Sequence, residues 1–127
     1  MGSNGERNAL RLELNEQTFP IIEQITEGMP GGFFIYYADG DGKLIYTNTA
    51  LIKMYGCRDR AELQAHTGYT FRGLVHPDDW ERVNASIQRQ VHDHDGFDYV
   101  EYQIIRRDGA VRWIKDYGRF IQTKTYG

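Results

Sequence analysis

This sequence has a single cysteine, no long apolar run and no excess of basic residues. Its single cysteine, Cys57, excludes an internal disulfide framework and any zinc site that needs several cysteines. Lys and Arg number 15 against 18 Asp and Glu, so the net charge is −3. The chain therefore lacks the basic excess by which nucleic-acid-binding domains hold phosphates, and we expect no nucleic-acid partner.

No apolar stretch approaches the roughly 20 residues that span a bilayer. The sequence also does not start with a basic segment followed by an apolar one, as a secretory signal would. We therefore expect a cytoplasmic location without direct membrane insertion, and the parent protein is free to be membrane-attached.

Aromatic side chains are what the sequence has in plenty, at 13% with nine tyrosines. A length of 127 residues suits one domain, and the apolar (40%) and charged (26%) fractions are ordinary for a folded protein. Such a chain can bury a core without disulfides or metals.

The first 28 residues are predicted to be an N-terminal extension that contains a helix, followed by a domain over 29–127. Residues 9–16 fit two patterns, because their leucines alternate as in a strand while Leu10 and Leu14 also stand one helical turn apart. The composition favours helix, and both interpretations stay open. A second helix is predicted over about 19–27, with Thr18 as its cap and Ile21, Ile22 and Ile25 on its apolar side.

From Gly32 the apolar period changes to two. Short strands are predicted over 33–38 and 43–47, joined by the hairpin signal Asp39-Gly40-Asp41-Gly42. Asn48 or Thr49 then caps a short helix that Gly56 ends, and 58–64 forms one or two more helical turns. The stretch 66–74 is predicted to be irregular.

The clearest helix begins at His76-Pro77-Asp78-Asp79, where proline costs no hydrogen bond and the aspartates face the positive end of the helix dipole. Its apolar stripe is Trp80, Val83, Ile87 and Val91. Two long strands follow over 97–106 and 110–122, with Arg107-Asp108-Gly109 as the turn. Hairpins imply antiparallel pairing, so the fold class is α+β with the helices over one face of the sheet.

These motifs in this order resemble the PAS (PAS/PAC) sensory-domain family. The resemblance covers about 29–126 and rests on five groups of residues: Pro30-Gly31-Gly32-Phe33-Phe34, the hairpin at 39–42, Tyr46-Thr47-Asn48 with Tyr55-Gly56, His76-Pro77-Asp78-Asp79, and Arg107-Asp108-Gly109 with Arg112-Trp113. It implies a five-stranded antiparallel sheet with helices over one face and a pocket between them. In this family the last strand is central and follows the Arg-Trp strand, so we expect the sequence to stop one strand short. That slot would be filled by the Leu10–Leu14 stretch, by a partner chain or by re-pairing of the flanking strands.

Strand parity places Val100, Tyr102 and Ile104 on one face, which should meet the helices. By the register that the resemblance implies, the first and last strands turn Phe34, Tyr36, Arg112 and Ile114 inward and Trp113 outward. The candidate ligand pocket is therefore lined by Phe34, Tyr36, Leu51, Met54, Val83, Ile87, Tyr102, Ile104, Arg112 and Ile114. Either a small polar or aromatic ligand binds between the two tyrosines, or their side chains fill the space. Arg112 either neutralises a ligand carboxylate or reaches solvent.

No cofactor is predicted. Haem is disfavoured because the inner positions of the long helix, Val83 and Ile87, are apolar. Flavin is disfavoured because Cys57 lies outside the motif of the family's photosensors, and because Ile104 and Ile114 replace polar groups. The hairpin at 39–42 lacks the remaining ligands of a calcium loop, and His92 and His94 diverge at a helix end, so no metal is predicted. His76 is interpreted as a helix cap rather than a base.

The candidate interface residues are Leu10, Leu14, Ile21, Ile25 and Trp113. An outward tryptophan on an open sheet face needs a cover, and an N-terminal helix of this chain or of a partner would provide it. We thus expect a homodimer. The resemblance to PAS domains brings no catalytic residues, so we expect no catalytic activity.

The function expected is that of a sensory module in a bacterial signalling protein, a histidine kinase of a two-component system or a cyclic-dinucleotide enzyme such as a diguanylate cyclase, with its output domain in the same chain. The alternative is a dimerisation or relay domain with a filled pocket. A small enzyme built on the curved sheet ranks last, since it would need a pocket carboxylate and Asp116 is the sole inward candidate.

Overall fold

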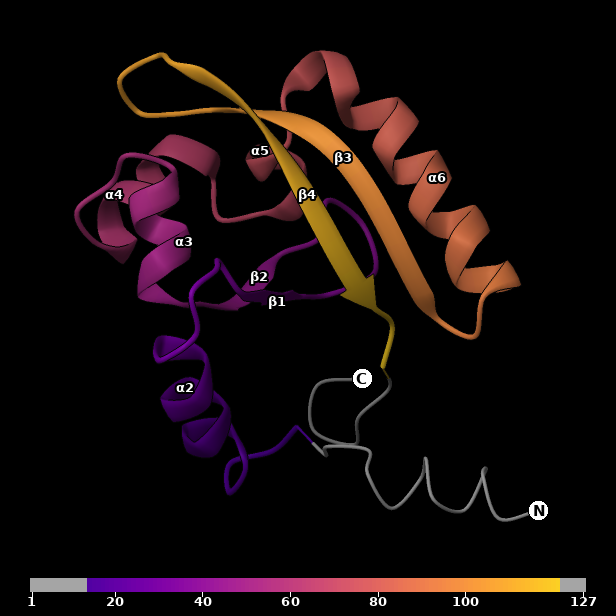
Figure 1. The fold of residues 1–127 in the computed structure, drawn as a ribbon, viewed down its shortest axis with the longest axis horizontal. Helices are drawn as coiled ribbons and strands as arrows, with labels where there is room; N and C mark the ends of the chain where they lie inside the picture. Colours follow the sequence, from indigo (N-terminus) through magenta and orange to yellow (C-terminus); the bar gives the residue numbers. More distant parts are fainter. Residues whose placement is uncertain (1–13, 122–127) are drawn as a thin grey trace.

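A computed structural model describes residues 14–121 (Figure 1). Two antiparallel hairpins and a set of helices make up this part of the chain, which confirms the α+β class. In chain order the elements are α2 (Phe19–Glu27), β1 (Phe34–Tyr36), β2 (Leu44–Thr47), α3 (Thr49–Met54), α4 (Arg60–Thr67), α5 (Phe71–Leu74), the 3₁₀ turn η1 (Pro77–Asp79), α6 (Trp80–Asp93), β3 (Phe97–Ile105) and β4 (Val111–Arg119).

Helix α2 has the predicted bounds, but its predicted apolar side is divided. Ile22 is buried, whereas Ile21 and Ile25 are exposed. Thr18 occupies the N-cap position as predicted, but its side chain makes no capping bond to the helix. The turn before the helix is instead held by Asn15, whose Oδ1 accepts from the backbone N–H groups of Gln17 and Thr18 at 2.9 and 3.0 Å.

The fully buried amide of Asn48 joins α2, the β1–β2 hairpin and α3. Its Oδ1 accepts from the N–H groups of Leu51 and Phe33, at 3.0 and 2.9 Å, so it caps α3 as predicted. Its Nδ2 donates to the carbonyls of Thr26 and Gly31, at 2.9 and 3.0 Å. Every hydrogen-bonding position of this buried side chain is used, which an interior polar group requires.

The stretch predicted to be irregular contains helical structure. Helix α4 extends to Thr67, and residues 71–74 form the single turn α5, whose Gly73 N–H donates to the capping Thr70 hydroxyl at 2.9 Å. Four residues are too few to show a helical period, so α5 left no sign in the sequence pattern. The Phe71 N–H donates to the Gly42 carbonyl at 2.7 Å, which ties α5 to the β1–β2 turn.

The long helix begins as predicted, with one difference. Residues 77–79 form the 3₁₀ turn η1, and the α-helical part starts at Trp80. His76 is the structural cap: its Nδ1 accepts from the Asp78 N–H at 3.1 Å.

Strands β3 and β4 pair over their whole length, from Phe97 opposite Arg119 to Ile105 opposite Val111. The turn between them is tied to α3, because the Arg107 N–H donates to the Tyr55 carbonyl at 2.8 Å and Arg106 Nη1 donates to the Met54 carbonyl at 3.2 Å. These bonds satisfy carbonyls at the C-terminal end of α3 that have no partner within the helix.

The outer edge of β3, opposite β4, is covered by the helical segments, through their side chains and one backbone N–H, rather than by a strand. The amide of Gln90 both accepts from the N–H of Tyr99 and donates to its carbonyl, at 2.9 Å each. For Gln103, Asp79 Oδ2 accepts from the N–H and the His76 N–H donates to the carbonyl, at 2.8 Å each. These bonds close an edge that would otherwise offer unpaired backbone groups.

Two further side chains continue this cover of the β3 edge. Arg82 donates to the Glu101 carbonyl at 3.1 Å, and His66 Nε2 lies 2.7 Å from the Ile105 carbonyl oxygen. Helices α4 and α6 are thereby fixed to the same strand, as Figure 1 shows for α6 alongside β3.

The two hairpins form separate sheets within residues 14–121, with β1 paired to β2 and β3 paired to β4. The central fifth strand remains a prediction, and residues 10–13 of its suggested substitute lie outside the described residues. Leu14, the last residue of that stretch, is buried. None of the helices in the described part is long and apolar enough to cross a membrane.

The aspartate pair at η1 allows a test of the edge cover. Asp79 is buried and bonded to β3, whereas the side chain of its neighbour Asp78 is 88% exposed. We expect Asp79→Ala to lower the free energy of unfolding by about 1–3 kcal/mol, because it leaves the partly buried Gln103 N–H without its acceptor. Urea denaturation measures this, and the matched control Asp78→Ala should change stability by less than about 0.5 kcal/mol. Equal losses in both variants would contradict the assigned role.

Candidate functional site

Nine of the ten predicted pocket residues lie together in one apolar cluster. Leu51, Val83, Tyr102 and Ile104 are buried in it, and Phe34, Tyr36, Met54, Ile87 and Ile114 pack against it partly buried. The tenth, Arg112, is exposed, and its Nη1 donates to the neighbouring Val111 carbonyl. Arg112 therefore takes the predicted alternative of reaching solvent.

An aromatic stack links the two hairpins through a residue that sequence reasoning missed. The Phe71 ring of α5 lies 4.6 Å from Tyr36 and 5.8 Å from Phe34, with both rings stacked on it. The same ring meets Tyr102 edge-on at 6.1 Å and Trp80 edge-on at 5.6 Å. Phe71 is thus at the centre of the candidate pocket and occupies space between the predicted tyrosines.

The Tyr102 hydroxyl donates to Asp116 Oδ2 at 2.7 Å, a length typical of a bond to a carboxylate. Tyr102 has no exposed surface, and burial together with the Asp116 charge raises the pKa of its phenol well above the ordinary value. Burial likewise raises the pKa of Asp116, while the bond from Tyr102 opposes this shift. The inward position suspected for Asp116 is therefore occupied by a half-buried carboxylate with one protein donor.

A second carboxylate on this face, Asp98, was not predicted. It stands two residues before Val100, so strand parity alone was enough to place it with Val100 and Tyr102. Tyr36 faces both carboxylates, and burial followed by their charges raises its pKa.

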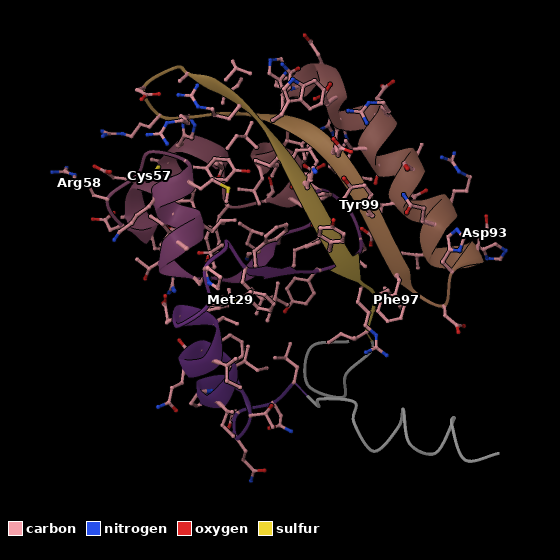
Figure 2. All side chains as sticks on the ribbon, in the orientation of Figure 1. Met29, Cys57, Arg58, Asp93, Phe97 and Tyr99 are labelled. Carbon is pink, nitrogen blue, oxygen red and sulfur yellow. The ribbon has the colours of Figure 1, made fainter. Side chains whose placement is uncertain are left out.

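The opposite face of the β3–β4 pair carries exposed aromatic side chains. Trp113 is 64% and Tyr117 77% exposed, which agrees with the outward direction expected of Trp113. Tyr117 packs against Tyr99, with ring centres 4.6 Å apart, and the Arg119 guanidinium lies 4.9 Å from the Phe97 ring. Figure 2 shows Tyr99 and Phe97 along this pair of strands.

The predicted interface residues lie in different settings. Leu14 is buried within the chain, Ile21 and Ile25 are exposed on α2, and Leu10 lies outside the described residues. Exposed Met29 follows the end of α2, four residues after Ile25. The chain thus presents an apolar line on α2 and an aromatic face on β3–β4.

The other residues considered for chemistry, Cys57 and the 39–42 turn, lie in environments that indicate structural roles. Cys57 is buried and burial raises the pKa of its thiol, which makes it a poor nucleophile. Gly40 and Gly42 both have positive φ in the tight β1–β2 turn, as expected of a hairpin. Among residues 14–121 no three His, Cys, Asp or Glu side chains come together to hold a metal ion.

Tyr102→Phe tests the polar centre of this site. Without the hydroxyl the Asp116 carboxylate loses its donor, and its pKa in the folded state rises further. We expect a loss of about 1–2 kcal/mol in the free energy of unfolding. The loss should be larger at neutral pH than at pH 4, because the variant must ionise a half-buried carboxylate that has lost its donor. The control Tyr117→Phe removes an exposed hydroxyl and should have no effect; a pH-independent loss in Tyr102→Phe would contradict this account.

A comparison with protein-family models matches residues 44–126 to the PAS fold. No curated protein matches the chain significantly. The matched region runs from the start of β2 beyond the end of β4 and so contains the buried face of the β3–β4 pair and every helix from α3 to α6. Membership of the family suggests a sensory or regulatory module. Because the match covers more than half of the sequence, this chain belongs to the PAS-fold family.

Proposed function

We propose that this PAS domain is the sensory module of a larger cytoplasmic or membrane-attached signalling protein, a histidine kinase or a cyclic-dinucleotide enzyme, and that it responds to a small molecule. The observation that carries the proposal is a polar centre inside an aromatic cluster. The Tyr102 hydroxyl and the Asp116 carboxylate lie among Tyr36, Phe34 and Phe71. Small-molecule sites are typically apolar hollows with a few placed polar groups.

The charges on this face favour a neutral or cationic ligand over an anionic one. Asp98 and Asp116 share the buried face, whereas the cation expected to meet a ligand carboxylate, Arg112, is exposed. Neither flavin nor haem is proposed, because Val83, Ile87, Ile104 and Ile114 offer no ligand for iron and no hydrogen bond for a flavin ring.

Phe71 links ligand binding in the site to the conformation of the domain. A ligand beside Tyr102 displaces the Phe71 ring, and α5 moves with it because it is one turn of four residues. That turn is bonded to the β1–β2 hairpin through Gly42 and packs on Trp80 at the start of α6. The ligand then shifts the domain between two packings, by as much as its affinities for them differ. No catalytic step is assigned to the domain itself.

A relay domain with a filled interior is the second candidate, favoured by one specific observation. Phe71 already stacks on Tyr36 and Phe34, and Tyr102 already has a partner in Asp116, so the space has an internal occupant. In this alternative a partner domain, rather than a ligand, repacks the same residues.

A ligand screen separates the two candidates. We expect a small amine or a neutral aromatic compound to raise the melting temperature, whereas dicarboxylates do not. At 100 times its Kd, such a compound adds about 2.7 kcal/mol. Calorimetry should show weaker binding to Tyr102→Phe and unchanged binding to the control Tyr117→Phe. Absence of any binder from a broad panel, with the domain a stable dimer, would favour the relay.

We also propose a homodimer in which the exposed aromatic face around Trp113 and Tyr117 is covered by the partner. The apolar line Ile21 and Ile25 on α2 is a suitable cover, because both side chains are exposed and an aromatic face would remove them from water. Burial of exposed apolar surface is the driving force of such association.

Trp113→Gln should weaken the dimer without unfolding the domain, because the tryptophan is 64% exposed in the single chain. We expect at least a tenfold rise in the dimer dissociation constant, measured by analytical ultracentrifugation, with circular dichroism unchanged. The control Tyr37→Gln alters an exposed aromatic at the β1–β2 turn and should leave the constant as it was. Equal dissociation constants for Trp113→Gln and the unsubstituted protein would place the interface elsewhere.

A further inference from the structure

Two carboxylates are diagonal neighbours on the buried face of the β3–β4 pair. Asp98 is opposite Gly118, and Asp116 is opposite Val100. Asp116 and Gly118 are two residues apart on β4, so Asp98 and Asp116 are diagonal neighbours on one face, close enough for their side chains to interact. Like charges at such positions repel each other.

Gly118 makes room for the Asp98 carboxyl group. A Cβ atom at Gly118 would lie 2.8 Å from both carboxyl oxygens of Asp98, closer than real contacts allow. The carboxyl group therefore lies over the β4 backbone at Gly118, two residues from Asp116. Asp98 is half-buried in this position.

Within residues 14–121, the groups that face the pair bring no cation. Strand β4 contributes Asp116 and β1 contributes Tyr36, while Tyr102 of β3 donates to Asp116 and Tyr55 approaches it from the end of α3. Helix α6 packs on this end of β3 through the neutral amide of Gln90. The basic residues of β4 are elsewhere, since Lys115 and Arg119 have the opposite parity and Arg112 is exposed near the turn.

We propose that Asp98 and Asp116 form a proton-binding pair that couples pH to the packing of β1 against the β3–β4 strands. With one proton the pair carries a single charge, and the phenol of Tyr36 packs over it. Loss of that proton places two negative charges on a face where the described residues offer no cation to balance them, which loosens the contact with Tyr36 and its hairpin. This device goes beyond the proposed function and needs no small-molecule ligand.

Stability depends on pH because folding raises the pKa values of both Asp98 and Asp116. Burial, and then the charge of Asp116, raises the pKa of Asp98 from 3.8 to about 6, while burial raises that of Asp116. The folded chain therefore binds this proton on the order of a hundredfold more tightly than an unfolded one does. Stability is greatest below pH 4 for this pair and falls as pH rises from about 4 to about 6. Because the carboxyls interact, the midpoints belong to the pair.

Carbon-13 NMR of the side-chain carboxyl groups in the 127-residue chain tests the proposal directly. We expect one carboxyl of the pair to titrate with a midpoint near pH 6, and the ring signals of Tyr36 to move with the same midpoint. In Asp98→Asn the Tyr36 signals should no longer move between pH 5 and 7. The fall in urea stability between pH 4 and 6 should also be smaller in the variant than in the unsubstituted protein, since only Asp116 of the pair remains to titrate.

Asp93→Asn is the matched control, because it removes an exposed aspartate at the end of α6 and should leave both profiles unchanged. The proposal is overturned if neither Asp98 nor Asp116 has a midpoint above about pH 5 in the unsubstituted protein, a measurement that does not depend on the variant folding. It is also overturned if the two carboxyls titrate but the Tyr36 signals do not follow them.

Discussion

The outer edge of β3 is the element on which the rest of the structure depends. A strand edge under packed helices must find partners for its N–H and carbonyl groups, and here these come from side chains and one backbone N–H of the helical segments rather than from another strand. Gln90 reproduces both bonds of a neighbouring strand at Tyr99, and Asp79 with the His76 N–H does the same at Gln103. Helix α6 and the turn before it are therefore positioned by the backbone of β3, in addition to their apolar contacts. Because these bonds fix the position of β3, they also fix the position of Tyr102 and, through the paired strand β4, that of Asp116 on the buried face.

Much of this architecture was predictable because its signals are local. Asp-Gly turns fix hairpins, Asn48 and the His76-Pro77 pair fix helix starts, and alternation fixes which residues of β3 face the helices. The edge cover was not predictable, since it depends on distances between residues far apart in sequence, such as His66 and Ile105. Helix α5 was missed for a different reason: a single turn has no period, and its threonine cap is a weak sign by itself.

The candidate site shows which features of a side chain's position strand parity can predict. Parity assigns a face, and it placed Tyr102 and Ile104 correctly in the core. It does not give depth, so Arg112, close to the β3–β4 turn and with a long side chain, extends into solvent despite its inward parity. Asp98 was overlooked because a carboxylate is not expected on an apolar face, although its position two residues before Val100 required it. Phe71, at the centre of the site, lies in a segment for which no helix or strand was predicted.

The bonds between the β3–β4 turn and the end of α3 have a mechanical consequence. Arg106 and Arg107 fasten the tip of the hairpin to the carbonyls of Met54 and Tyr55, next to two side chains of the candidate pocket, Met54 and Leu51. Each strand of the hairpin has nine residues, a length of about 30 Å at the usual rise. A tilt of about 3° imposed at this attachment becomes a displacement of about 1.5 Å at the far end, near Arg119. A small movement of the hairpin tip beside the pocket is thus enlarged at the opposite end of the two strands, near Arg119.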